Sequence, residues 1–64
     1  MDNFSYKVTL NWHGEIHIIY TDAIGPSRAL NNAEFQLARK LGVTYSYVNR
    51  QFIGGKDNFK VERR

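Results

Sequence analysis

The chain has 64 residues, of which 42% are hydrophobic and 14% aromatic, a size that allows one small domain over residues 1–64. The absence of cysteine excludes disulfides and thiolate metal ligands, so the packing of aliphatic and aromatic side chains must stabilise the fold. No apolar run approaches the length of a membrane span, and the acidic start Met1-Asp2-Asn3 is not typical of a secretory signal. We therefore expect a cytoplasmic protein without a membrane partner.

Positive charge is concentrated in the later part of the chain. The formal net charge is +3, and every lysine and arginine except Lys7 follows Pro26. Such a basic segment favours an acidic partner: nucleic acid, an anionic membrane face or an acidic protein surface. The alternative interpretation is a basic surface that serves only solubility.

The first two elements are predicted to form an antiparallel hairpin. Residues 4–12 alternate between apolar and polar side chains with a period of two, and residues 15–20 resume the alternation. Between them, His13-Gly14 supplies a tight turn in which glycine readily adopts a positive φ.

The aromatic side chains of this hairpin are predicted to face the core. Tyr6 and Tyr20 are expected on the inward faces of their strands. A sheet that binds RNA displays aromatic side chains on its open face instead, so this arrangement disfavours that mode of binding. The residues expected on the open face are Lys7, Thr9, His17, Ile19 and Lys60.

A helix is predicted over residues 26–41, after a connector at residues 21–25. Pro26 suits the first position of a helix, and Gly42 is typical of the position just after the last helical residue. Apolar residues recur between them at helical spacing. The stripe that packs on the hairpin consists of Leu30, Ala33, Leu37 and Leu41, with Ala29 and Ala38 beside it.

Residues 43–53 allow two interpretations. As a strand, they place alternate apolar and aromatic residues on one face. As a helix capped by Thr44, they place Tyr45, Val48 and Phe52 on one stripe. The sequence alone does not choose between these two.

The last element is predicted to be a strand. Gly54-Gly55 indicates a turn, and residues 58–62 alternate again, which favours pairing with the hairpin. The expected fold is α+β, a small two-layer ββα(α)β domain in which a helix packs on one face of an antiparallel three-stranded sheet. A strand in place of the short helix would give ββαββ.

The sequence does not favour an enzyme, a cofactor or a metal site. His13 and His17 are the only imidazoles, and no nucleophile, base and orienting group are spaced to converge. His13, Glu15 and His17 are better explained as polar residues near a turn than as metal ligands. The glycines before Lys56 lack the spacing of a phosphate-binding loop.

Residues 34–53, EFQLARKLGVTYSYVNRQFI, resemble the helix-turn-helix of phage-repressor-like DNA-binding proteins. Ala38 stands where the two helices cross closely, Gly42 at the left-handed turn, and Val48 where the second helix enters the core. Gln51 departs from the pattern, which usually has an apolar residue there, and a hairpin replaces the usual preceding helix.

This resemblance implies contacts to the major groove and the phosphates of DNA, and together with the basic segment it makes DNA or RNA the expected partner. Asn49 is suited to adenine and Arg50 to guanine, and the neighbouring polar residues to phosphates. The residues that the resemblance assigns to these contacts are Thr44, Tyr45, Ser46, Asn49 and Arg50. Electrostatic docking to the phosphate backbone would add Arg39, Lys40, Lys56 and Lys60.

Phe35 falls on the polar face of the predicted helix, opposite the apolar stripe. We expect residues 45–53 to cover it. If it is exposed, Arg28, Phe35 and Arg39 form an anchor cluster for a protein partner, since arginine and aromatic residues dominate interface hot spots.

The order of the predicted elements is similar to that of the very small ββαβ phage proteins that inhibit host RNA polymerase. This resemblance implies a phage-encoded modulator that binds an acidic protein surface in the bacterial cytoplasm. The leading hypothesis is a basic, non-catalytic module that binds nucleic acid, for example in transcription regulation. A module that forms a homodimer through its sheet edges is a further alternative.

Overall fold

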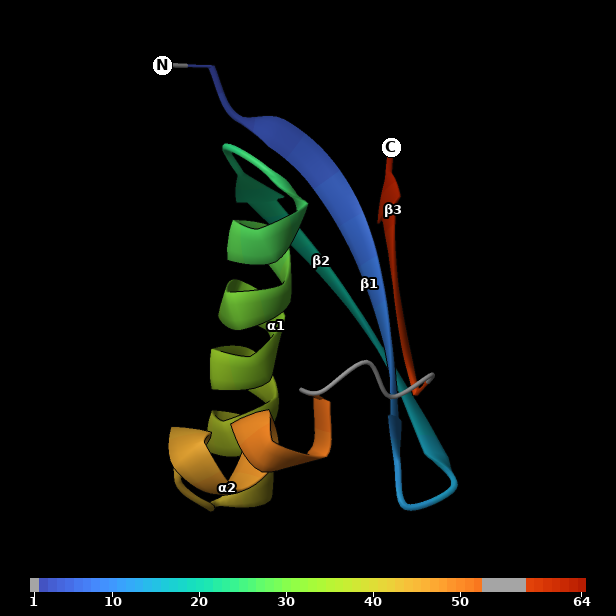
Figure 1. The fold of residues 1–64 in the computed structure, drawn as a ribbon, viewed down its shortest axis with the longest axis vertical. Helices are drawn as coiled ribbons and strands as arrows, with labels where there is room; N and C mark the ends of the chain where they lie inside the picture. Colours follow the sequence, from blue (N-terminus) through green and yellow to red (C-terminus); the bar gives the residue numbers. More distant parts are fainter. Residues whose placement is uncertain (1, 53–57) are drawn as a thin grey trace.

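The computed structural model describes residues 2–52 and 58–64, which form one antiparallel sheet with helices on one side of it (Figure 1). The elements in chain order are β1 Phe4–Trp12, β2 Glu15–Ala23, α1 Pro26–Leu41, α2 Tyr45–Asn49, the 3-10 helix η1 Arg50–Phe52, and β3 Phe59–Arg63. The strand order is β2-β1-β3. The predicted small two-layer ββα(α)β fold is confirmed. The turn expected at Gly54-Gly55 lies outside the described residues.

The hairpin closes through a two-residue turn, as predicted. His13 and Gly14 both have positive φ values, 52° and 88°, which is the combination that a type I′ turn requires. The side chain of Asn11 accepts a hydrogen bond from the Gly14 N–H at 2.8 Å. This turn pairs Trp12 with Glu15 and thereby sets the register of both strands.

β2 continues beyond its predicted end. Residues 21–23, which were expected in the connector, stay paired with β1 as far as the pair Phe4–Ala23. The hydroxyl of Ser5 also donates a hydrogen bond to Asp22 Oδ1 at 2.8 Å. The connector to α1 is therefore limited to residues 24–25.

The inward face of β1 is as predicted, but that of β2 is not. Tyr6 and Leu10 are buried. The register places Leu10 opposite His17, and directly opposed residues share a face of the sheet. His17 is accordingly 8% exposed in the core, whereas Tyr20 is 56% exposed on the open face. The prediction of a core Tyr20, with His17 and Ile19 on the open face, is wrong.

The open face of the sheet holds the other residues predicted there. Thr9 pairs with Lys60 on β3 and with Ile18 on β2, and Lys7 pairs with Tyr20. Because opposed residues share a face, this face combines the cations Lys7 and Lys60 with large apolar side chains from β2.

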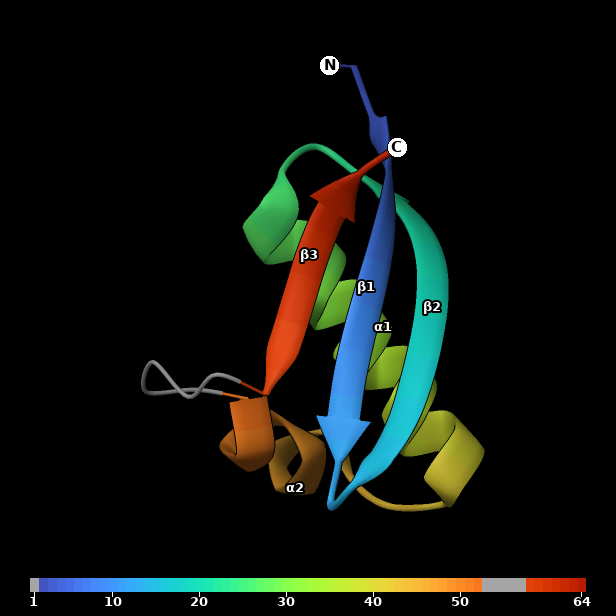
Figure 2. The ribbon, with the colours of Figure 1, turned by 90° about the vertical axis from the view of Figure 1, so that its right-hand side faces the viewer.

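α1 begins at Pro26, as predicted, and crosses the sheet diagonally from the β3 side to the β2 side (Figure 2). Gly25 is its N-cap, and the Gly25 carbonyl accepts a hydrogen bond from the Ala29 N–H at 3.0 Å. The diagonal lays the helix across one face of all three strands. Its buried side chains are Ala29, Ala33, Glu34, Leu37 and Ala38.

The helical interpretation of residues 43–53 is confirmed over their described part. Thr44 is the N-cap of α2, and its Oγ1 accepts a hydrogen bond from the Tyr47 N–H at 3.3 Å. Val48 and Phe52 are buried, as the predicted stripe requires. The ring of Phe52 meets that of Phe59 edge to face, so α2 and η1 close the core below the start of β3.

Candidate nucleic-acid interface

The turn between α1 and α2 depends on a left-handed residue. Gly42 has a φ of 73°, and its N–H points to the carbonyls of Ala38 and Arg39. The Val43 N–H donates to the Ala38 carbonyl at 3.0 Å. These bonds satisfy carbonyls that the end of a helix leaves free, and they redirect the chain into α2.

The two helices belong to one core. Leu37 and Ala38 of α1 and Val48 of α2 are all buried and lie in the same apolar cluster. A small side chain at Ala38 leaves room for close packing. The unit formed by the end of α1, the turn and α2 is therefore a fixed part of the fold.

A buried polar network ties α2 to α1. Glu34 is 1% exposed, and its Oε1 accepts a hydrogen bond from Asn49 Nδ2 at 2.8 Å. The same amide nitrogen lies 3.3 Å from the hydroxyl of Tyr45, which donates to Asn31 Oδ1 at 3.2 Å. Glu34 Oε2 is buried without a hydrogen-bond partner among the described residues.

Burial shifts the pKa values of two groups in this network. Desolvation raises the pKa of Glu34 above its ordinary value, although the hydrogen bond from Asn49 opposes the shift. Burial, together with the nearby Glu34 carboxylate, also raises the pKa of Tyr45. Glu34 was not predicted as a site residue, although its spacing from Leu30 and Leu37 places it on the apolar stripe of α1.

Phe35 lies on the outer surface of α1 and is only partly covered. Its ring stacks on the ring of Tyr45, with 4.0 Å between centroids and 14° between planes. Phe35 nevertheless remains 55% exposed. The predicted cover by residues 45–53 is therefore incomplete, and Arg28 and Arg39 are exposed on the same helix.

The residues predicted to contact nucleic acid fall into separate groups. Tyr45 and Asn49 are partly buried and use their polar atoms within the fold. Lys60 lies on the open face of the sheet, and Lys56 lies outside the described residues. The remaining five are exposed around the end of α1 and on α2 and η1, and we call them the turn surface: Arg39, Lys40, Thr44, Ser46 and Arg50.

The stretch of sequence that carries the turn surface contains three cations and no carboxylate. No aspartate or glutamate occurs in the sequence between Phe35 and Phe52. By contrast, the C-terminal arginines contact aromatic rings: the Arg63 guanidinium lies 3.8 Å from the ring centroid of Phe4, and that of Arg64 lies 4.6 Å from the centroid of Tyr20.

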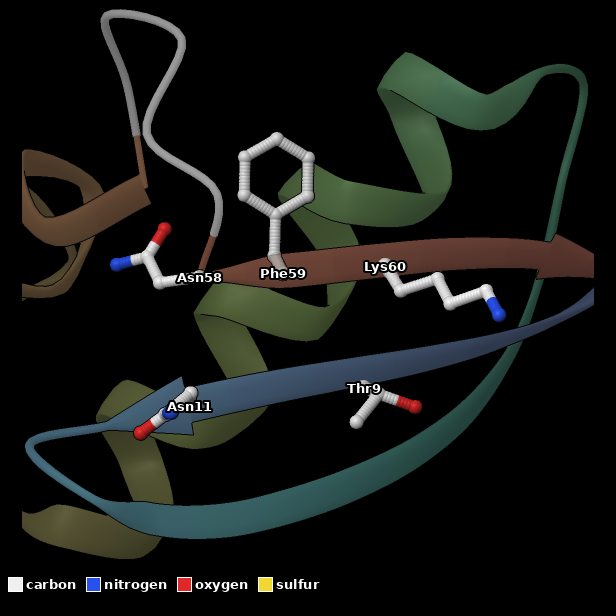
Figure 3. Close-up of a pocket in the computed structure, with 5 residues that line it drawn as sticks. All are labelled: Thr9, Asn11, Asn58, Phe59 and Lys60. Atoms are coloured by element: carbon white, nitrogen blue, oxygen red, sulfur yellow. The ribbon is translucent and has the colours of Figure 1, made fainter.

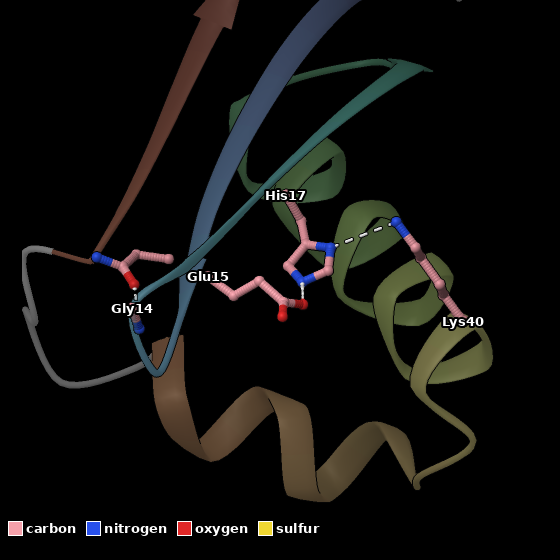
Figure 4. A network of polar contacts seen from close by, with 5 residues as sticks. Gly14, Glu15, His17 and Lys40 are labelled. Atoms are coloured by element: carbon pink, nitrogen blue, oxygen red, sulfur yellow. Dashed lines mark hydrogen bonds and ion pairs between the residues drawn. The ribbon is translucent and has the colours of Figure 1, made fainter.

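One cation of the turn surface contacts the sheet (Figure 4). Lys40 Nζ lies 3.4 Å from Nδ1 of the buried His17, and His17 Nε2 lies 2.6 Å from Glu15 Oε1. A lysine ammonium can only donate, so His17 Nδ1 is the acceptor in the contact with Lys40. Lys40 is thus anchored while its side chain stays exposed.

A shallow polar hollow lies elsewhere, where β1 meets β3 (Figure 3). Thr9 and Lys60 are opposed in the register, and the Asn11 N–H donates to the Asn58 carbonyl at 2.9 Å. Phe59 completes the lining. Lys60 belongs to this hollow rather than to the turn surface.

Among residues 2–52 and 58–64, no three histidine, aspartate or glutamate side chains are grouped so that they could hold a metal ion. None of the helices in this described part is long and apolar enough to cross a membrane.

Comparison with known proteins adds no relative: no family model matches the chain, and neither a curated protein nor a solved structure matches it.

Proposed function

We propose that this protein is a small non-catalytic module that binds nucleic acid through the turn surface, in processes such as transcription regulation. The observation that carries the proposal is the charge of this surface. Arg39 and Lys40 are exposed in the last turn of α1 and Arg50 at the start of η1, and no carboxylate occurs in the sequence between Phe35 and Phe52. Such a surface attracts the phosphate backbone.

Backbone contact, rather than base reading, is the mode that the geometry favours. The amide of Asn49, which would suit adenine, donates to Glu34 within the fold. Contacts to phosphates fix the position of a protein on nucleic acid but carry little sequence information. We therefore expect weak sequence preference, with Ser46 and Thr44 adding hydrogen bonds to phosphate oxygens.

Two triple variants with the same loss of charge test this proposal. The first removes the cations of the turn surface: Arg39→Ala, Lys40→Ala and Arg50→Ala. The control removes three cations located elsewhere: Lys7→Ala, Arg28→Ala and Lys60→Ala. Affinities are measured by fluorescence anisotropy with labelled duplex DNA, single-stranded DNA and single-stranded RNA.

We expect the first triple variant to lose roughly tenfold or more in affinity and the control to lose much less. Equal losses in both variants would mean that net charge, and not this surface, governs binding. No binding by the native protein to any of the three probes at low salt would overturn the proposal.

A second candidate function is supported by the exposure of Phe35. A stacked, half-exposed aromatic ring on the same helix as Arg28 and Arg39 has the composition of an anchor for an acidic protein surface. Purified bacterial RNA polymerase is the partner to titrate, because the similarity to small phage inhibitors implies it. Binding that Phe35→Ala abolishes, with nucleic-acid binding unchanged, would support this second function.

A further inference from the structure

The second strand forms a long free edge of the sheet. β2 has nine residues and, within residues 2–52 and 58–64, pairs only with β1, while α1 lies on its inner face (Figure 2). Three of its side chains, Ile16, Ile18 and Tyr20, are each at least half exposed on the open face. A long apolar edge of this kind is a template for pairing with another strand.

The backbone of these same three residues points to the free edge. On β1, the backbone groups of Asn11 and Ser5 point toward the side of β3. The Asn11 N–H donates to the carbonyl of Asn58, just before β3, and the Ser5 carbonyl accepts from the N–H of Arg64, just after β3. Ile16, which is opposite Asn11, therefore belongs to a pair that is not hydrogen-bonded to β1, and its N–H and C=O face outward. Because the direction of the backbone groups alternates along an antiparallel strand, the N–H and C=O groups of Ile18 and Tyr20 also face outward.

The centre of β2 lacks the usual protection of an edge strand, since its carboxylates Glu15 and Asp22 lie near the two ends. Its sequence, EIHIIYTDA, contains no lysine, arginine or proline. The opposite edge differs, since the shorter β3 carries Lys60, Glu62 and Arg63. Charged side chains and short length discourage pairing at β3, so the two edges of the sheet are not equivalent.

We propose that β2 pairs with β2 of a second copy of this chain, antiparallel and centred on Ile18, to form a continuous sheet across a two-fold axis. In this register, Ile18 lies opposite Ile18 of the second copy. Ile16 of each copy lies opposite Tyr20 of the other copy. All three are residues whose backbone groups point outward, so each pair exchanges ladder hydrogen bonds. Paired apolar and aromatic side chains across strands stabilise such a ladder.

The charges at the strand ends agree with this register. Glu15 falls opposite Thr21 of the second copy, and Asp22 falls opposite Gly14, so no two carboxylates are directly opposed. Shifting the centre by one residue to Ile19 would instead oppose Ile16 to Asp22, which places an apolar side chain against a carboxylate. The register centred on Ile18 is therefore the favoured one. This inference is independent of the proposed nucleic-acid binding.

Sedimentation velocity of the native chain over a range of concentrations tests the proposal, with two lysine variants as a matched pair. Ile18→Lys places a charge on the two-fold axis. Thr9→Lys places the same charge on the same face, directly opposite Ile18 but on the central strand. We expect a reversible dimer for the native chain and for Thr9→Lys, and a monomer for Ile18→Lys.

Amide hydrogen exchange identifies the edge itself. The amides of Ile16, Ile18 and Tyr20 should exchange more slowly as the protein concentration rises, whereas His17 and Ile19, which bond to β1, should be protected at every concentration. A native chain that stays monomeric would overturn the proposal and leave an extended segment of another protein as the partner of the edge. A dimer that persists in Ile18→Lys, or one without added protection at Ile18, would also overturn it.

Discussion

Asn49 donates its side-chain amide to the buried carboxylate of Glu34 across 2.8 Å, which joins α2 to α1. The residue best suited to read adenine is thereby used to hold the helix pair together. The charged and short polar side chains that remain exposed on this part of the fold are Arg39, Lys40, Arg50, Thr44 and Ser46. The same hydrogen bond that fixes this surface thus favours contact with phosphates over contact with bases.

Replacing Glu34 tests how much stability the fold loses by burying an ionised carboxylate. The folded state raises the pKa of Glu34 above 4.5, so the folded protein holds this proton more tightly than the unfolded chain does. The resulting stability is fully present below the unfolded-state pKa and is lost as the pH rises through the folded-state pKa. Glu34→Gln stays neutral and keeps an oxygen for Asn49, so it should unfold at a higher temperature than the native protein at pH 7.

Thermal unfolding followed by circular dichroism between about pH 4 and pH 8 measures this effect. The advantage of Glu34→Gln should vanish at the acidic end, where the native carboxyl is protonated in both states. A variant that is less stable at neutral pH, or that keeps the native pH dependence, would contradict the assignment.

The left-handed turn predicts a ranking of substitutions at Gly42. Apart from its chain neighbours, no described residue has an atom within 4 Å of a Cβ added there, so the penalty comes from the φ of 73°. Gly42→Ala should cost roughly 1–2 kcal/mol, whereas Gly42→Asn should cost less, because asparagine tolerates this conformation. Chemical denaturation of both variants measures the difference. Equal stability of the native protein and Gly42→Ala would show that the turn does not need this backbone conformation.

Two phenylalanines should respond very differently to truncation. Phe52 is 2% exposed in the core, so Phe52→Ala should cost about 3–5 kcal/mol, enough to threaten folding of so small a chain. Phe35→Ala should lose mainly the stacking on Tyr45, about 0.5–1.5 kcal/mol. Urea unfolding compares them. A large loss for Phe35→Ala would make Phe35 a structural residue and remove the second candidate function.

The strands, the long helix and the fold class could be predicted from the sequence because each rests on a local period or a local turn. The face of β2 could not be predicted from hydrophobicity, since Ile16, Ile18 and Tyr20 look more like core residues than His17 does. The two-residue turn decides the face by opposing His17 to Leu10. Counting the register from that turn would have given the correct answer.

The site was less predictable because its polar partners are distant in sequence. Asn49 and Glu34 are 15 residues apart, and nothing local indicates that the amide of Asn49 is used within the fold. The helical spacing does place Glu34 on the apolar stripe. However, a carboxylate is normally predicted to be exposed, and the sequence does not indicate that Asn49 pairs with it. The exposure of Arg39 and Arg50, in contrast, follows directly from their side-chain chemistry.

The most direct test of nucleic-acid binding is the salt dependence of affinity for duplex DNA, measured by fluorescence anisotropy between about 50 and 200 mM salt. The native protein should bind with an affinity that falls steeply with salt. Arg50→Ala should lower the slope of log affinity against log salt by about one unit, while Lys7→Ala on the open sheet face leaves it unchanged. No binding at the lowest salt, or equal slopes for the native protein and Arg50→Ala, would contradict binding through the turn surface.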